Sequence, residues 1–304
     1  MTTWSNAAKV VLIVAILVAA GLLISRLVRS LLQPAPDATG ERSIVSGGVE
    51  RTYALHIPSD PEAASDPLPL VFVFHGAGGG GPEMQQSSGI DAVADDLGVI
   101  AVYPDAAGEN WSEGIGSRPE RLGVDDVGFV RDLLAELESA YAIDPNRIYA
   151  IGFSQGGFFA HRLAIDLPER IVAYATVAAS MSPVIADRYE TPSPIPVLMM
   201  HGTLDATFLR QGASEGTFAY LSQDALVELL SESNGCVAEE TVYFTLDSSE
   251  VSAEVHGSSH ADSTERILVE HYTIVGGSHA WRWGRLDTAK TILEFLLRFS
   301  RGDP

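Results

Sequence analysis

Short apolar runs recur along this chain, and turn-forming or polar residues follow each of them at once. Helical spacing of apolar residues appears between these runs. The strand-length runs cover residues 49–57, 70–74, 99–103, 148–151, 172–177, 197–200 and 269–275, and the helical stretches cover 87–97, 125–141, 158–167, 218–230 and 288–299. Strands that alternate with helices at this interval predict an α/β fold with a mostly parallel sheet covered by helices on both faces.

The N-terminal segment has a different pattern. Residues 10–24 form a stretch of 15 residues without a charge, and basic residues flank it on both sides. A bilayer span needs about 20 residues, a length that this stretch reaches if it continues to Leu32 with its arginines extended to the headgroups. We therefore expect an apolar membrane anchor over residues 1–32. A cleaved secretory signal is the alternative, since Val18-Ala19-Ala20 offers small residues for cleavage.

Residues 33–44 contain prolines and polar residues and are typical of a linker. One globular domain is expected from residue 45 to residue 304, outside the cytoplasm and either anchored or secreted. Its single cysteine, Cys236, excludes an intrachain disulfide.

The formal charge of −21 limits the classes of molecule that the protein is expected to bind. Nucleic-acid phosphates and anionic membrane surfaces both require clustered lysines and arginines, so this balance argues against binding to either. A neutral substrate fits the acidic surface better than a polyanion does.

The central chemical signal lies at residues 148–157. The apolar run there leads into Gly152-Phe153-Ser154-Gln155-Gly156, a match to Gly-x-Ser-x-Gly, and a helix-compatible segment follows directly. This strand–turn–helix context holds a serine on a strained turn with its hydroxyl exposed. The flanking glycines are needed because side chains there would collide with the neighbouring strand or helix. A glycine-rich turn with an incidental serine is the alternative interpretation of the motif alone.

Polar residues follow other predicted strands as well. His75-Gly76, Asp205 and His279 each come just after an apolar run, and ligands of open α/β sheets bind beyond such carboxyl ends. The chain order Ser154, Asp205, His279 is that of a nucleophile, an acid and a base in hydrolases. His279 would take the serine proton, and Asp205 would orient and stabilise the imidazolium.

The oxyanion of such a reaction needs donors that are already in place. We expect the backbone N–H groups of Ala77 and Gln155 to supply them. His256 and His260 with Asp262 lack convincing ligand spacing, so neither a metal nor another cofactor is expected.

Together these segments resemble the polyhydroxybutyrate depolymerase and feruloyl esterase family of α/β-hydrolases. The resemblance covers about residues 45–300, and the matching segments are 48–58, 75–79, 124–130, 152–157, 201–205 and 276–281. It implies an α/β-hydrolase fold and an extracytoplasmic esterase whose nucleophile, acid and base are Ser154, Asp205 and His279. It also implies that Asp125 and Asp126 position the following helix and that Trp281 lines the substrate cleft. We place His75 and Trp111 around the substrate too, His75 mainly as a brace.

The sequence departs from that family in one motif. Trp281 continues into Arg282-Trp283-Gly284, where the family usually has Trp-Pro-Gly, so the resemblance does not identify the acyl or alcohol pocket and leaves the ester open. A small-molecule or polymeric ester is the expected substrate. A serine peptidase, a thioesterase and a catalytically silent binding module are the alternatives, and no oligomeric state follows from the sequence.

Overall fold

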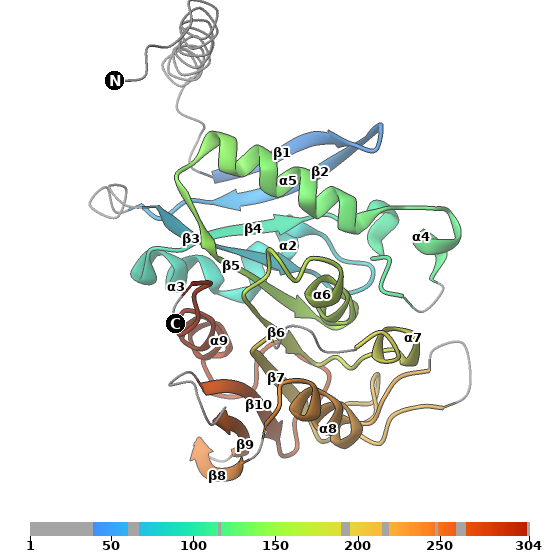
Figure 1. Cartoon of the computed structure of the whole chain (residues 1–304), viewed down its shortest axis with the longest axis vertical. Coiled ribbons are helices and arrows are strands. Elements are labelled where there is room, and N and C mark those ends of the chain that lie inside the picture. The colour runs from blue at the N-terminus through green and yellow to red at the C-terminus, as the bar shows by residue number, and fades with distance from the viewer. Residues whose placement is uncertain are drawn as a thin grey trace, which may run out of the picture. The chain divides into compact units, whose positions relative to one another are not determined.

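The fold is built on a ten-stranded sheet whose strands lie in the order β1-β2-β4-β3-β5-β6-β7-β10-β9-β8 (Figure 1). The computed structural model describes residues 39–59, 67–114, 117–189, 195–214, 219–236, 238–246, 249–259 and 266–302. The strands are β1 (Thr39–Ser46), β2 (Val49–His56), β3 (Leu68–Phe74), β4 (Ile100–Pro104), β5 (Ile143–Phe153), β6 (Ala173–Val177), β7 (Val197–Gly202), β8 (Ala238–Leu246), β9 (Ser249–Ser259) and β10 (Arg266–Ile274).

The centre of the sheet is parallel and its two ends are antiparallel. Parallel pairing joins β4, β3, β5, β6, β7 and β10 in turn. Antiparallel pairing adds β2 and β1 at one end and β9 and β8 at the other. The prediction of a mostly parallel sheet is confirmed. Parallel strands need crossover connections, which is why helices separate the central strands along the chain.

Helices cover both faces of this sheet. They are α2 (Gly81–Ser88), α3 (Ile90–Leu97), α4 (Arg118–Arg121), α5 (Asp126–Ala140), α6 (Gln155–Asp166), α7 (Pro183–Ala186), α8 (Gln223–Ser233) and α9 (Thr288–Leu296), and a short 3-10 turn, η2, spans Ala107–Glu109. One core layer includes residues of α5, α6 and α8, and the other includes residues of α2, α3 and α9.

The strand β3 shows how the two core layers form. Leu70, Phe72 and Phe74 belong to the layer under α5 and α6, whereas Val71 and Val73 belong to the opposite layer. Successive side chains of a strand point to opposite faces, so a strand buried on both sides has a continuous apolar sequence. The apolar run at 70–74 therefore becomes a central strand.

Local signals fix where several helices begin and end. The expected helix at 87–97 is divided, because Gly89 takes a left-handed φ of 76° and ends α2 just before α3. The helix expected at 218–230 begins only at Gln223, since the Ser222 side chain caps it by accepting a hydrogen bond from Ala225 N. Asp125 caps α5 in the same way through Gly128 N, as expected from the sequence.

The expected linker at 33–44 ends earlier in the structure. The strand β1 begins at Thr39 and pairs with β2 along its whole length, so residues 39–44 belong to the domain. The sequence did not predict β1, because most residues of this edge strand are polar. The expected anchor over residues 1–32 lies outside the described residues. None of the helices within the described ranges has the length and apolar content of a membrane span.

Candidate active site

Ser154 occupies a strained turn between β5 and α6. Its φ is 54° and its ψ is −123°, a backbone conformation that residues with a side chain rarely adopt. A Cβ at Gly152 would overlap the carbonyl oxygen of Gly156, and one at Gly156 would overlap that of Phe74. The two glycines therefore allow β5, α6 and β3 to approach closely enough to hold the turn. The hydroxyl stands at the carboxyl end of the central strand.

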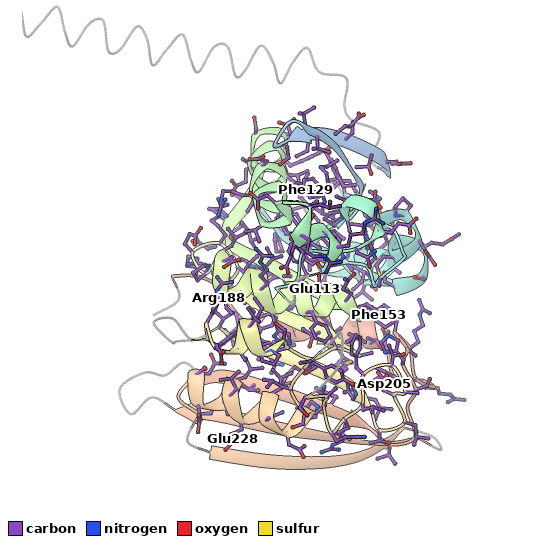
Figure 2. The ribbon with its side chains drawn as sticks, turned by 90° about the vertical axis from the view of Figure 1, so that its right-hand side faces the viewer. Glu113, Phe129, Phe153, Arg188, Asp205 and Glu228 are labelled. Carbon is purple, nitrogen blue, oxygen red and sulfur yellow. The ribbon has the colours of Figure 1, made fainter. Side chains whose placement is uncertain are left out.

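His279 lies between Ser154 and Asp205. Its Nε2 is 2.9 Å from Ser154 Oγ, and its Nδ1 is 2.8 Å from Asp205 Oδ2. The three residues come from the ends of β5, β7 and β10, and Figure 2 shows Asp205 on the same side of the molecule as Phe153, the neighbour of Ser154. The structure thus brings together the three side chains that the sequence singles out, far apart in the chain.

Backbone contacts tie the loop that carries Asp205 to the loop that carries His279. Thr203 N donates to Ile274 O at 2.9 Å, and Leu204 N donates to Gly277 O at 2.8 Å. A Cβ at Gly202 would overlap the Gly277 carbonyl, so the loops need a glycine there to pack this closely. The backbone contacts consequently hold Asp205 and His279 in fixed positions relative to each other.

The Asp205 carboxylate is completely buried and accepts three hydrogen bonds. Thr207 N and Phe208 N donate to Oδ1 at 2.8 and 2.9 Å, and His279 Nδ1 lies against Oδ2. His201 Nε2 stands 4.0 Å from the same oxygen, and burial lowers the pKa of His201 to about 4, so that imidazole is neutral at pH 7. A carboxylate at Nδ1 keeps the proton there and leaves Nε2 free to accept from the serine hydroxyl.

His75 supports the loop that passes beside Ser154. Its Nε2 accepts from Ala106 N at 3.1 Å, so Nδ1 carries the proton and donates to Gly76 O at 2.7 Å. Burial lowers the pKa of His75, which favours this neutral form. A Cβ on Gly76 would come within 3.1 Å of Ser154 Cβ. The peptide that leads into Ala77 therefore lies directly against the strained turn.

Gln155 begins α6, so its backbone N–H has no acceptor within the helix and lies at the positive end of the helix dipole. Hydrogen bonds to Glu113 and Trp111 hold its side chain in place. Gln155 Nε2 donates to Glu113 Oε1 at 3.0 Å, and Trp111 N donates to Gln155 Oε1 at 3.3 Å. Glu113 is only 1% exposed, and burial raises its pKa. Glu113 was not predicted from the sequence, because it lies in an irregular stretch without a motif.

The three residues expected to contact the substrate are largely buried. Trp111 has no exposed surface; it stacks on Phe159 at 4.9 Å, and its Nε1 donates to His75 O at 2.9 Å. His75 is 2% exposed and Trp281 is 8% exposed. Trp281 packs edge-on against Phe153 at 6.2 Å and donates to Ser88 O. Trp111 and Trp281 pack behind the walls of the site, where their rings have apolar neighbours and their N–H groups have acceptors. His75 lies in the lining of the pocket itself.

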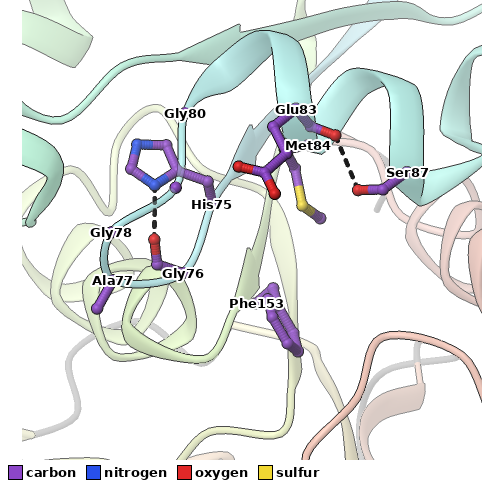
Figure 3. Close-up of a pocket in the computed structure, with 10 residues that line it drawn as sticks. His75, Gly76, Ala77, Gly78, Gly80, Glu83, Met84, Ser87 and Phe153 are labelled. Carbon is purple, nitrogen blue, oxygen red and sulfur yellow. Dashed lines mark hydrogen bonds between the residues drawn. The ribbon is translucent and has the colours of Figure 1, made fainter.

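The structure reveals a pocket that the sequence analysis missed. It has a volume of about 200 Å³ and is lined by His75, Gly76, Ala77, Gly78, Gly79, Gly80, Glu83, Met84, Ser87 and Phe153 (Figure 3). Phe153 also lies 5.4 Å from the His279 ring between centroids, and Phe208 lies 5.7 Å from it on another side. The sequence signals were the segment 75–79 and Phe153, which directly precedes the serine; the wall from α2 carried no signal.

Asp126 has a supporting place near this site. Its fully buried carboxylate pairs with Arg51 at 2.6 Å and accepts from Ser112 N at 2.8 Å, which holds the segment that carries Trp111 and Glu113. Among the described residues, no three potential metal ligands gather in one place, and the side chains of His256 and His260 lie outside the description.

The chain belongs to the family described as the alpha/beta hydrolase fold, which it matches over residues 69–294. It is 31% identical over 294 residues to NocK of Nocardia uniformis subsp. tsuyamanensis, a protein named as a candidate esterase, with 87% of this chain and 85% of NocK covered.

Feruloyl esterase B of Piromyces equi is 26% identical over 229 residues, which cover 72% of this chain and 40% of that enzyme. The poly(3-hydroxybutyrate) depolymerase of Ralstonia pickettii is 32% identical over 125 residues, which cover 37% of this chain and 25% of that one. The chain therefore spans less than half the length of these two relatives. The resemblance stated from the sequence motifs is confirmed.

Proposed function

We propose that this protein is a carboxylic ester hydrolase that uses Ser154 as its nucleophile, His279 as its base and Asp205 as its acid. One observation carries the proposal: a continuous line of contacts runs from Ser154 Oγ through His279 to Asp205, with distances of 2.9 and 2.8 Å. A serine hydroxyl is too weak an acid to attack a carbonyl unaided, and this arrangement supplies the base that it needs.

The first half of the reaction forms an acyl-enzyme. Ser154 Oγ attacks the ester carbonyl while His279 Nε2 takes its proton, and Asp205 stabilises the imidazolium that results. The N–H groups of Ala77 and Gln155 would receive the developing oxyanion, since the first lies in the loop against Ser154 and the second opens α6. His279 then gives the proton to the departing alcohol. In the second half, water attacks the acyl-enzyme with His279 again as the base.

The names of the relatives favour an ester over an amide. NocK is named as a candidate esterase, and the Piromyces and Ralstonia proteins are named for feruloyl ester and polyester cleavage. A small-molecule or polymeric ester is the substrate that we propose. No observation favours a peptidase, a thioesterase or a silent binding module over it.

We further propose that the enzyme acts outside the cytoplasm, with residues 1–32 as a membrane anchor or secretion signal. The support is the uncharged stretch at 10–24 and its basic flanks. In this arrangement the catalytic domain starts at Thr39, after a shorter linker than the sequence predicted.

The test of this function is a burst experiment with a p-nitrophenyl ester. We expect rapid release of about one equivalent of nitrophenol, and a fall in kcat of about 10⁴-fold or more in Ser154→Ala. Ser139→Ala changes an exposed serine on α5 and serves as the matched control. A Ser154→Ala protein that is folded and keeps the control's activity would remove the proposal. Labelling of the unaltered protein, but not of the variant, by a fluorophosphonate tests the same nucleophile independently.

A further inference from the structure

The pocket beside Ser154 is placed to hold one of the two groups that flank the ester bond. Phe153 forms one of its walls and is the residue just before the nucleophile. The loop from His75 to Gly80 forms another wall. This loop lies so close to the nucleophile that a Cβ added to Gly76 would be 3.1 Å from Ser154 Cβ. Helix α2 closes the pocket with Glu83, Met84 and Ser87 (Figure 3).

Its apolar wall is rigid. Met84 is buried, and Phe153 is held between Trp281 and His279 at ring distances of 6.2 and 5.4 Å. The volume of about 200 Å³ is below the range of about 300–1,000 Å³ that is typical of pockets for drug-sized ligands. A small group fits this space.

The polar rim of the pocket carries one charge. Glu83 and Ser87 are both exposed and lie one helical turn apart on α2. In Figure 3 the Glu83 carboxylate lies between Met84 and the loop of His75. Ser87 Oγ donates to the backbone oxygen of Glu83 at 2.8 Å, so its own oxygen stays available as an acceptor. The rim therefore accepts hydrogen bonds.

Glu83 has an unpaired charge among the residues that the structure describes. Glu83 forms no ion pair there, and Arg282 donates its Nε to Ser87 O instead, at 3.1 Å. The ring of His75 is neutral and both of its nitrogens are used. Behind the glycine loop, Asp105 adds a second carboxylate, which accepts from Gly81 N at 2.6 Å. Two carboxylates therefore lie at or behind the pocket lining, and both disfavour an anion there.

We propose that Glu83 determines specificity by selecting a small, uncharged, hydroxyl-bearing group next to the ester bond. The hydroxyl donates to the Glu83 carboxylate, and the carbon atoms of the group pack against Met84 and Phe153. A group with a free carboxylate or phosphate is excluded. This inference rests on the proposed esterase function and deepens it. The group belongs either to the acyl part or to the alcohol part of the ester, and separate arms of the experiment distinguish the two.

The acyl arm compares p-nitrophenyl esters of propionate, 3-hydroxypropionate and succinate, the last with its second carboxylate free. The alcohol arm compares the acetates of propanol, glycerol and glycolate. In at least one arm we expect kcat/KM for the hydroxyl-bearing ester to exceed that for the plain ester by about tenfold, the effect of one hydrogen bond to a charged group. In that arm the anionic ester should be the poorest substrate.

The variant Glu83→Gln removes the charge and keeps the shape of the side chain. In the responding arm we expect it to reduce the hydroxyl preference to about threefold or less and to raise kcat/KM for the anionic ester relative to the plain one. Glu136→Gln, which neutralises an exposed carboxylate on α5, is the matched control and should leave both ratios as they were. Equal melting temperatures of the two variants would establish that both are folded.

The outcomes separate the two levels of the proposal. If the unaltered protein cleaves no plain ester in either arm, the esterase function fails. If it cleaves plain esters but Glu83→Gln leaves both ratios unchanged in both arms, the esterase function stands and the role of Glu83 is overturned.

Discussion

Ser154 shows how much of the site depends on single positions. Its φ of 54° is tolerated because Gly152 and Gly156 let three backbone segments meet, and the motif therefore predicted the turn from the sequence. Asp205 and His279 were predicted to lie at the site because each follows a predicted strand. Glu113 could not be found in this way, because its importance arises from burial against Gln155 and not from its neighbours in the sequence.

Glu113 gives a prediction at this scale. Burial raises its pKa above the value of about 4.3 in an unfolded chain. Between those two pKa values the folded protein binds more protons than the unfolded chain, so this group makes stability fall as the pH rises through that window. Glu113→Gln cannot ionise and keeps an acceptor for Gln155. We expect the free energy of unfolding of the variant, relative to that of the unaltered protein, to increase from pH 4 to pH 8.

Urea titrations at several pH values measure this difference. Glu136→Gln, at an exposed position, should show a nearly constant difference over the same range. A constant difference for Glu113→Gln as well would mean that the buried carboxyl titrates as an ordinary one does.

At the scale of elements, strongly apolar segments were the most predictable. The central strands and the amphipathic helices α5 and α9 follow directly from sequence periodicity. The edge strand β1 did not, because most of its residues are polar and its structure comes from pairing with β2. Helix α2 has only Met84 as a large apolar residue, so the sequence did not show which side of it faces the site. The pocket residues Glu83 and Ser87 were missed for that reason.

The pairing of β2 with α5 through Arg51 and Asp126 gives a second prediction. Both side chains are buried, Arg51 lies over the Phe129 ring at 4.0 Å, and Asp126 also holds Ser112 N. Asp126→Asn would leave the arginine charge buried without a counter-ion. We expect the free energy of unfolding to fall by about 3 kcal/mol or more, measured by urea denaturation.

The exposed pair of Lys290 and Glu294 on α9, 3.7 Å apart, provides the comparison. Glu294→Gln should cost less than about 0.5 kcal/mol because solvent already screens this pair. Similar losses in the two variants would contradict the assigned role of the buried pair.

For the whole molecule, buried histidines set the response to acid. Burial lowers the pKa of His161 to about 3 and that of His201 to about 4, and it also lowers the pKa of His75. The unfolded chain takes up these protons near pH 6.5, well before the folded protein does. The unfolded state therefore binds more protons between about pH 6.5 and 4, and stability is lost as the pH falls through this range.

His161→Gln tests this expectation, because it removes one such group from the helix α6 while a polar side chain remains near Tyr174, whose hydroxyl is 3.0 Å from His161 Nδ1. Calorimetric melting temperatures should fall less steeply between pH 6.5 and 4 in the variant than in the unaltered protein. Parallel curves would show that His161 does not contribute to acid lability.

The walls of the pocket come almost entirely from one uninterrupted stretch, residues 75–87, whereas Ser154, Asp205 and His279 come from three later strand ends. Under the proposed function, substrate preference and bond cleavage are therefore encoded in separate parts of the polypeptide. Exchanging residues 75–87 between relatives is then expected to exchange their ester specificities and to leave Ser154, Asp205 and His279 unchanged.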